Sequence, residues 1–338
     1  MKLHNSKEFI AQYSKTVTPG MGFDASLDLG TWQRSARDRL KELLGLPLER
    51  CDDDFKILRT EEESGYKKIT FEFQSEPGYY LECVMLCPLQ QTKPLPVAIC
   101  LQGHSTGKHI SLGYQLFQSD TEDYVNRTNI AVQAVRNGYC AVAFDQRYMG
   151  SAGQNEKGNP QCFGSTTVFP TLLMGRTPIG ERVWDVQRVI DVLEKHFASY
   201  VDPEKILCTG NSGGGTTTFY AAAMDERIHL AVPSCAVCSF DDSIIPLSHC
   251  GCNYIPGIRK YFDMGDIGCL IAPRKVIVVN GDQDDGFPIE GAKKAYRVMT
   301  SAYEKAGRPE NCHMIVGNGG HQYYKDDIWP KIREMMER

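Results

Sequence analysis

The sequence lacks the features of a chain built for a membrane or a nucleic acid. Its 338 residues contain no apolar run long enough to cross a bilayer, no internal repeat and no low-complexity tract. A formal net charge of −5 gives no sign of the excess positive charge that binds nucleic acid or anionic lipid. The beginning of the chain has no apolar stretch and no small-residue cleavage site, so we expect no signal peptide. Nucleic-acid and membrane partners are therefore not expected.

An even, regularly spaced set of cysteines, which would indicate a disulfide framework, is also missing. The chain has 13 cysteines, an odd number. Several lie inside apolar, strand-like runs, namely Cys83, Cys87, Cys100, Cys140 and Cys208. Reduced, buried cysteines occur in such runs, and free thiols in this number predict a cytoplasmic protein.

Short apolar runs alternate with helical patterns from about residue 91 to the end. This order predicts an α/β fold with a mostly parallel central sheet and helices on both faces. The predicted strands of this part cover residues 95–101, 139–144, 206–208, 229–235, 275–280 and 312–316. The predicted helices cover residues 122–137, 179–197, 216–224, 289–306 and 325–336.

We interpret residues 1–338 as a single domain. Residues 1–90 form an N-terminal extension, irregular before about residue 27, with an amphipathic helix over 31–44 and then antiparallel strands over 55–59, 67–73 and 79–87. Residues 91–338 form the core. Two irregular insertions, at about 145–180 and 238–269, are expected to lie over a functional site, because long loops without regular structure usually serve one.

The pattern G-x-S-x-G follows the short apolar run 206–208, at Gly210-Asn211-Ser212-Gly213-Gly214. A strand, a sharp turn and a helix are the context that a nucleophile elbow needs, since the strained turn projects the serine hydroxyl above the sheet. The pattern alone also fits a glycine-rich turn that carries an incidental serine.

A serine hydroxyl needs a base to remove its proton, and the base is usually a histidine held by a carboxylate. Both occur later in the chain, each just after a predicted strand. His321 follows the strand 312–316, within a glycine-rich loop. Asp282, Asp284 and Asp285 follow the strand 275–280. All three are candidate acids, and a solvated turn or a helix cap is the alternative role of those that do not hold the histidine.

An oxyanion that develops during acyl transfer needs hydrogen-bond donors. The backbone N–H of Gly213, directly after the serine, is one predicted donor. The other is the N–H of His104, in the loop that follows the strand 95–101. Alternatively, Gly103-His104 is only a tight turn.

The segments GNSGGG, GDQDDGFP and GNGGHQYY, together with the LQGH loop, resemble the α/β-hydrolase superfamily. Residues 176–191 (RTPIGERVWDVQRVID) and 249–257 (HCGCNYIPG) resemble its acetyl xylan esterase-like and dienelactone hydrolase-like group. The spacing of Asp284 from Gly281 and Pro288 is typical of this fold, and the resemblance therefore favours Asp284 over Asp282 and Asp285 as the acid. Dienelactone hydrolases proper carry cysteine at the elbow, whereas this chain has Ser212, which favours ordinary esters.

The resemblance implies a serine esterase that works through an acyl-enzyme, with a carbohydrate acetyl ester as its substrate, as in acetyl xylan esterases and cephalosporin C deacetylases. Such an enzyme requires no cofactor and no metal. Its partner is a small-molecule or oligosaccharide ester, and no oligomeric state is implied. The alternatives are a serine peptidase of the prolyl-oligopeptidase kind and a non-catalytic binding protein on a hydrolase fold.

Three further groups have two interpretations each. Cys235 and Cys238, with His249, Cys250 and Cys252, could form a zinc or redox site, but a thiol-rich insertion without metal is favoured because Cys235 belongs to a strand. Ionic and aromatic residues of the helix 179–197 could face substrate or form a structural cluster, namely Arg182, Trp184, Asp185 and Arg188. Four tyrosines could line a sugar cleft or pack in the core, namely Tyr254, Tyr261, Tyr323 and Tyr324.

Overall fold

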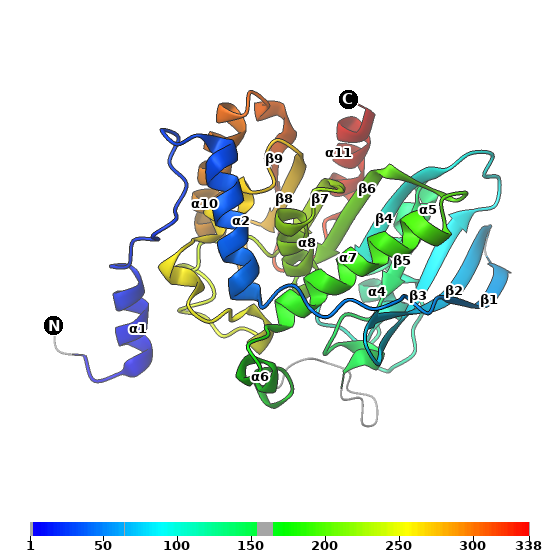
Figure 1. The fold of residues 1–338 in the computed structure, drawn as a ribbon, viewed down its shortest axis with the longest axis horizontal. Helices are drawn as coiled ribbons and strands as arrows, with labels where there is room; N and C mark the ends of the chain where they lie inside the picture. Colours follow the sequence, from blue (N-terminus) through cyan, green and yellow to red (C-terminus); the bar gives the residue numbers. More distant parts are fainter. Residues whose placement is uncertain (1–2, 64, 154–164, 338) are drawn as a thin grey trace.

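A mixed β-sheet with helices on both faces forms the frame of the protein (Figure 1). The computed structural model describes residues 3–63, 65–153 and 165–337. In these ranges the sheet has nine strands in the order β1-β2-β3-β5-β4-β6-β7-β8-β9. Their bounds are β1 Lys56–Glu63, β2 Tyr66–Glu76, β3 Tyr79–Pro88, β4 Leu95–Leu101, β5 Cys140–Phe144, β6 Val201–Asn211, β7 Ile228–Ser234, β8 Lys275–Gly281 and β9 Cys312–Gly317.

The sheet is antiparallel at one end and parallel over the rest. β1, β2 and β3 pair antiparallel, and β3 pairs antiparallel with β5. From β5 through β4, β6, β7 and β8 to β9, every neighbouring pair is parallel. This arrangement confirms the predicted fold class, and it brings the carboxyl ends of β4, β6, β7, β8 and β9 to one edge, where ligands of such sheets bind.

Two layers of helices cover the sheet. The helices are α1 Ser6–Ser14, α2 Leu29–Leu44, α3 Lys108–Ser111, α4 Glu122–Thr128, α5 Ile130–Arg136, α6 Ser165–Leu173, α7 Pro178–His196, α8 Gly213–Met224, α9 Met264–Cys269, α10 Ile289–Lys305 and α11 Lys325–Glu337. One core cluster joins α2, α7, α8 and α10 to the sheet, and the other joins α5 and α11 to it. Figure 1 shows α2, α7 and α8 in front of the strands.

Side chains that alternate along each buried strand belong in turn to the two core clusters. In β4, Val97, Ile99 and Leu101 lie in the cluster of α2, α7 and α8, whereas Ala98 and Cys100 lie in that of α5 and α11. Successive residues of a strand point to opposite faces, so a strand covered on both sides must be apolar throughout. This is why the buried strands appear in the sequence as uninterrupted apolar runs.

Two helix predictions were wrong. The helix expected over 122–137 is broken at Asn129, whose φ and ψ are −73° and 58°, so that α4 and α5 are separate. The side-chain amide of Gln133 spans the break, donating to the Arg127 carbonyl and to Oδ1 of Asn129. Helix α1 lies in the arm that was expected to be irregular, and the Asn5 side chain caps it by accepting from the N–H groups of Lys7 and Glu8.

Both predicted insertions contain some regular structure. The insertion at about 145–180 contains a 3₁₀ turn at Gly150–Ala152 and helix α6, and its residues 154–164 lie outside the described part of the chain. The insertion 238–269 contains two 3₁₀ turns, at Gly251–Asn253 and Ile258–Lys260, and then α9.

The ionic residues of α7 form a structural cluster beneath the first insertion. Arg147 makes a two-pronged ion pair with Asp185, at 2.8 and 2.9 Å. Asp185 also accepts from the Ser75 hydroxyl, and the Trp184 indole donates to the Ser75 carbonyl. These buried contacts tie the chain after β5 to α7 and β2, so the structural interpretation of this group is the one observed.

None of the helices in the described ranges combines the length and the apolar character that crossing a bilayer would demand.

Candidate active site

Ser212 occupies a strained turn between β6 and α8. Its φ and ψ are 54° and −121°, a backbone conformation that residues with a side chain rarely adopt. The turn is held by a hydrogen bond from the Ser212 N–H to the Ser234 carbonyl at the end of β7. Strand, turn and helix therefore follow one another as the G-x-S-x-G pattern predicts.

Gly214, two positions after Ser212, is required for the close packing of α8 on the end of β4. A Cβ atom on Gly214 would lie 2.1 Å from the carbonyl oxygen of Leu101 and 2.5 Å from that of Gln102. The first turn of α8 thus packs directly on the end of β4. The glycine lets the loop after β4 and the turn after β6 lie side by side.

His321 and Asp284 meet between the loops that follow β9 and β8. The Nδ1 atom of His321 lies 2.9 Å from Oδ2 of Asp284. The other carboxylate oxygen accepts from the backbone N–H groups of Gly286 and Phe287. Because both oxygens have partners, the buried carboxylate is fixed, and it holds the Nδ1 edge of the imidazole and leaves Nε2 available.

Burial alone would raise the pKa of the Asp284 carboxyl. The hydrogen bond and the charge of His321, the N–H of Phe287 and the Cys235 thiol together outweigh this effect and lower the pKa below its usual value. Asp284 is therefore an anion near neutral pH, the state that orients an imidazole through its Nδ1–H.

The other two candidate acids, Asp282 and Asp285, occupy different positions from Asp284. Asp282 accepts a hydrogen bond from the Gly319 N–H and so joins the two loops to each other. Asp285 lies on the wall of the cavity beside Ser212.

A cavity of about 360 Å³ connects the predicted site residues. Ser212, Gly213, His104 and His321 all line it. Its remaining wall includes Thr216, Ser248, His249, Cys250, Asn253, Asp285, Gly286 and Phe287. The structure thus brings the predicted serine and histidine to one cavity, with Asp284 behind the histidine.

The two predicted oxyanion donors lie on the same side of this cavity. A Cβ atom on Gly213 would lie 2.7 Å from Cε1 of His104, so the imidazole of His104 packs against the start of α8. Burial lowers the pKa of His104, but the neighbouring thiols of Cys252 and Cys250 outweigh burial and raise the pKa to about 9.

From the sequence, His249 and Cys250 of the second insertion were considered only as possible metal ligands, and the structure places both on the cavity wall. His249 lies 3.1 Å from the Ser243 hydroxyl, and its ring contacts that of Phe287 edge to face. Phe287 in turn stacks on His321, with the ring centroids 5.9 Å apart. Burial lowers the pKa of His249. The sequence signals for this wall were the irregular composition of residues 238–269 and the segment HCGCNYIPG at 249–257.

The four tyrosines considered for a sugar cleft are not among the described residues that line this cavity. Tyr323 and Tyr324 lie in the core cluster beneath α11. Tyr254 lines a separate apolar pocket that also includes residues of α1, and Tyr261 lies under the guanidinium of Arg39. Core packing or other contacts account for these tyrosines.

Two groups of side chains have ligand atoms close enough together for a metal ion, within the described residues. One is His104 with Cys250 and Cys252, and the other is Cys235 with Asp284 and His321. The cysteines that the sequence suggested as one set are therefore divided. Cys235 lies behind Asp284, whereas the Cys238 thiol contacts the Pro288 carbonyl.

The chain matches the profile of the Abhydrolase family over residues 4–325. It belongs to the abhydrolase family. This abhydrolase is 25% identical over 295 residues to a candidate hydrolase named YtaP of Bacillus subtilis (strain 168), a match that covers 84% of this chain and 92% of YtaP. It is also 30% identical over 179 residues to a 4-O-methyl-glucuronoyl methylesterase of Phanerochaete carnosa, which covers 44% of this chain and 43% of the fungal protein.

Among solved structures, the abhydrolase resembles a candidate acetyl xylan esterase from Bacteroides fragilis NCTC 9343. The TM-score is 0.83 at 18% sequence identity, and the superposition covers 99% of this chain and 96% of the Bacteroides chain. A similarity of this kind demonstrates the fold. The resemblance to the α/β-hydrolase superfamily, predicted from short motifs, is therefore confirmed.

Proposed function

We propose that this abhydrolase is a serine esterase that hydrolyses carboxylic esters through an acyl-enzyme. The observation that carries the proposal is the hydrogen bond between His321 and Asp284 beside a cavity that Ser212 also lines. A serine on a strained elbow, a histidine and a buried carboxylate form the set that activates a hydroxyl for attack on an acyl carbon.

In the proposed reaction, Ser212 Oγ attacks the ester carbonyl carbon while its proton passes to Nε2 of His321. The imidazolium, stabilised by the Asp284 carboxylate, then gives this proton to the leaving alcohol as the tetrahedral intermediate collapses. A water molecule next loses a proton to His321 and attacks the acyl-enzyme. Release of the carboxylic acid restores the Ser212 hydroxyl.

The oxyanion of each tetrahedral intermediate requires donors that are already in position. We assign this role to the backbone N–H groups of Gly213 and His104. Both residues line the cavity, and the packing of the His104 ring on Gly213 keeps the two loops together.

The substrate that we favour is an acetylated carbohydrate. The likeness to a candidate acetyl xylan esterase supports an acetyl ester. The cavity is at the small end of the range for ligand pockets, which suits a short acyl group. Asp285 is the one carboxylate among its described lining residues, and no lysine or arginine is among them.

A methyl ester of a uronic acid is the second candidate, because of the likeness to the fungal methylesterase. Such an ester is neutral before hydrolysis, so Asp285 does not oppose its binding. The two candidates differ in which side of the ester carries the sugar, and a panel of substrates separates them.

The test uses purified protein, a fluorophosphonate probe and a panel of esters. We expect the probe to label the wild type and not S212A, and we expect hydrolysis of aryl acetates and acetylated xylo-oligosaccharides. Faster hydrolysis of methyl glucuronates would assign the second candidate instead. Cleavage of aminoacyl-prolyl amides would indicate a peptidase, and an absence of labelling in the folded wild type would indicate a binding protein.

A further inference from the structure

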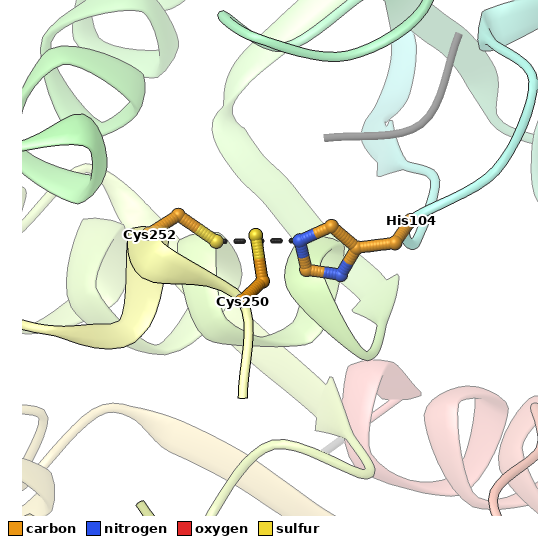
Figure 2. A group of neighbouring side chains, drawn as sticks. All are labelled: His104, Cys250 and Cys252. Carbon is orange, nitrogen blue, oxygen red and sulfur yellow. Dashed lines mark hydrogen bonds between the residues drawn. The ribbon is translucent and has the colours of Figure 1, made fainter. Parts of the chain in front are cut away.

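A histidine and two cysteines from distant parts of the chain converge beside the candidate site (Figure 2). The Nε2 atom of His104 lies 3.2 Å from Sγ of Cys252, 148 positions later in the chain. One ligand atom from each of His104, Cys250 and Cys252 lies within 4.8 Å of the other two. Figure 2 shows the two sulfur atoms on the same side of the imidazole ring.

We propose that His104, Cys250 and Cys252 form a binding site for a single divalent metal ion, with Zn²⁺ as the preferred occupant. Zn²⁺ prefers thiolate and imidazole ligands, whereas Mg²⁺ and Ca²⁺ prefer oxygen ligands such as carboxylates. In a tetrahedral site with normal Zn–S and Zn–N bonds, the ligand atoms are about 3.5–3.8 Å apart. The 3.2 Å between His104 Nε2 and Cys252 Sγ is a few tenths of an ångström short of this spacing, and the other pairs lie within 4.8 Å.

The local structure holds the two cysteines in place without the ion. They flank Gly251, which begins the 3₁₀ turn Gly251–Asn253. A Cβ atom on Gly251 would lie 2.5 Å from Cγ2 of Val168 in α6, so the turn is packed tightly against that helix. The N–H of Asn253 donates to the Cys250 carbonyl across the turn. Two ligands that are already fixed reduce the ordering cost of binding.

His104 is fixed from the other side. It follows β4, and its ring packs against Gly213 at the start of α8. The sulfur ligands therefore come from the second insertion and the nitrogen ligand from the loop after β4. An ion at this place would connect the second insertion to the loop after β4.

Three protein ligands leave one position of a tetrahedral ion for another group. His104 and Cys250 line the cavity of Ser212, whereas Cys252 is buried behind them. The fourth position thus faces the cavity, where a water molecule or a substrate oxygen could occupy it. The proposal stands on these contacts and does not depend on esterase activity.

The sequence interpretation that favoured a metal-free insertion did not include His104. Its motif grouped the cysteines with His249, but His249 contacts Ser243 and Phe287 instead. The ligand set becomes visible only when the loop after β4 is placed next to the 3₁₀ turn Gly251–Asn253.

The experiment is an anaerobic titration of the reduced, metal-stripped full-length protein with Co²⁺, a spectroscopic substitute for Zn²⁺. We expect binding of one equivalent, with sulfur-to-cobalt charge-transfer bands in the near ultraviolet and the visible bands of a tetrahedral ion. Zn²⁺ should displace the Co²⁺ completely. C250S and C252S should each weaken binding at least tenfold and reduce the charge-transfer bands, while C51S, a change at a half-buried cysteine in another pocket, should leave the titration unchanged.

Circular dichroism checks that each variant is folded, and either cysteine variant alone is sufficient for the comparison. The wild-type spectrum is a second, independent readout because it reports thiolate ligation directly. An absence of one-equivalent binding in the reduced wild type would overturn the proposal. So would a cobalt spectrum without charge-transfer bands, or one that C250S and C252S leave intact.

Discussion

The Nδ1 atom of His321 lies 2.9 Å from Oδ2 of Asp284, although the two residues are 37 positions apart and belong to different loops. The contact depends on two neighbouring parallel strands that end at the same level. If this pair orients the imidazole for catalysis, removing the carboxylate charge should affect the rate much more than it affects substrate binding.

We predict that D284N lowers kcat by about 10³- to 10⁴-fold with a small change in KM, because an amide can no longer stabilise the imidazolium or fix its tautomer. Steady-state hydrolysis of an aryl acetate measures the effect. D282N is the matched control, since an amide oxygen at Asp282 can still accept from the Gly319 N–H. Equal losses in the two variants would contradict the role of Asp284.

We predict that S212A lowers kcat by at least about 10³-fold and abolishes fluorophosphonate labelling, because no other hydroxyl occupies the elbow. The circular dichroism spectrum should be that of the wild type. Labelling that persists in S212A would show that another residue is the nucleophile.

The strained backbone at Ser212 gives a prediction about stability. A residue with a side chain at this φ and ψ costs roughly 1–3 kcal/mol, a cost that glycine avoids. S212G should therefore have a higher free energy of unfolding than S212A, by about 1 kcal/mol or more, in urea denaturation. Both variants lack the hydroxyl, so the comparison isolates the backbone. An S212G protein no more stable than S212A would argue against strain.

Close packing at Gly214 predicts a large loss. G214A places a methyl group 2.1 Å from the Leu101 carbonyl oxygen, and we expect the free energy of unfolding to fall by about 3 kcal/mol or more. G30A, in α2, is the control, because the nearest atom to its new Cβ is 3.7 Å away. Alanine favours the helix there, so G30A should be neutral or stabilising by up to about 1 kcal/mol. Similar urea midpoints for both variants would refute the packing argument.

The lowered pKa of Asp284 predicts how stability depends on pH. A carboxyl whose pKa is lower in the folded than in the unfolded state stabilises the fold fully above its unfolded pKa of about 3.9. This contribution is lost as the pH falls from there through the folded-state pKa. The difference in unfolding free energy between wild type and D284N should thus shrink as the pH falls below about 4. A difference that is constant between pH 6 and pH 3 would contradict the shift.

The strands of the sheet were predictable because buried strands must be apolar on both faces, as in β4. The convergence of Ser212, Asp284 and His321, which follow β6, β8 and β9, was also predictable, since loops at the carboxyl ends of parallel strands share one edge. The sequence did not separate Asp284 from Asp282 and Asp285 by itself. That choice depends on which carboxylate turns toward His321, and side-chain direction within a turn is not encoded in spacing.

Features that depend on contacts between distant segments were not predictable. The break at Asn129 is spanned by side-chain hydrogen bonds of Gln133, which a periodic apolar pattern does not reveal. Helix α1 begins at a cap by Asn5, in a segment too polar to show helical periodicity. The approach of His104 to Cys250 and Cys252 requires the loop after β4 to meet the second insertion. No local pattern in either segment indicates this contact.

The pairing of Gly281 with Gly317 places the last residues of β8 and β9 directly opposite each other. From these positions, short loops of similar length lead to Asp284 and His321. A slip of one residue between the two strands would displace one loop by about 3.3 Å and turn its strand's side chains to the other face. The register of β8 and β9 therefore sets whether Asp284 reaches His321. A register error there would leave the sheet paired but would separate the two side chains.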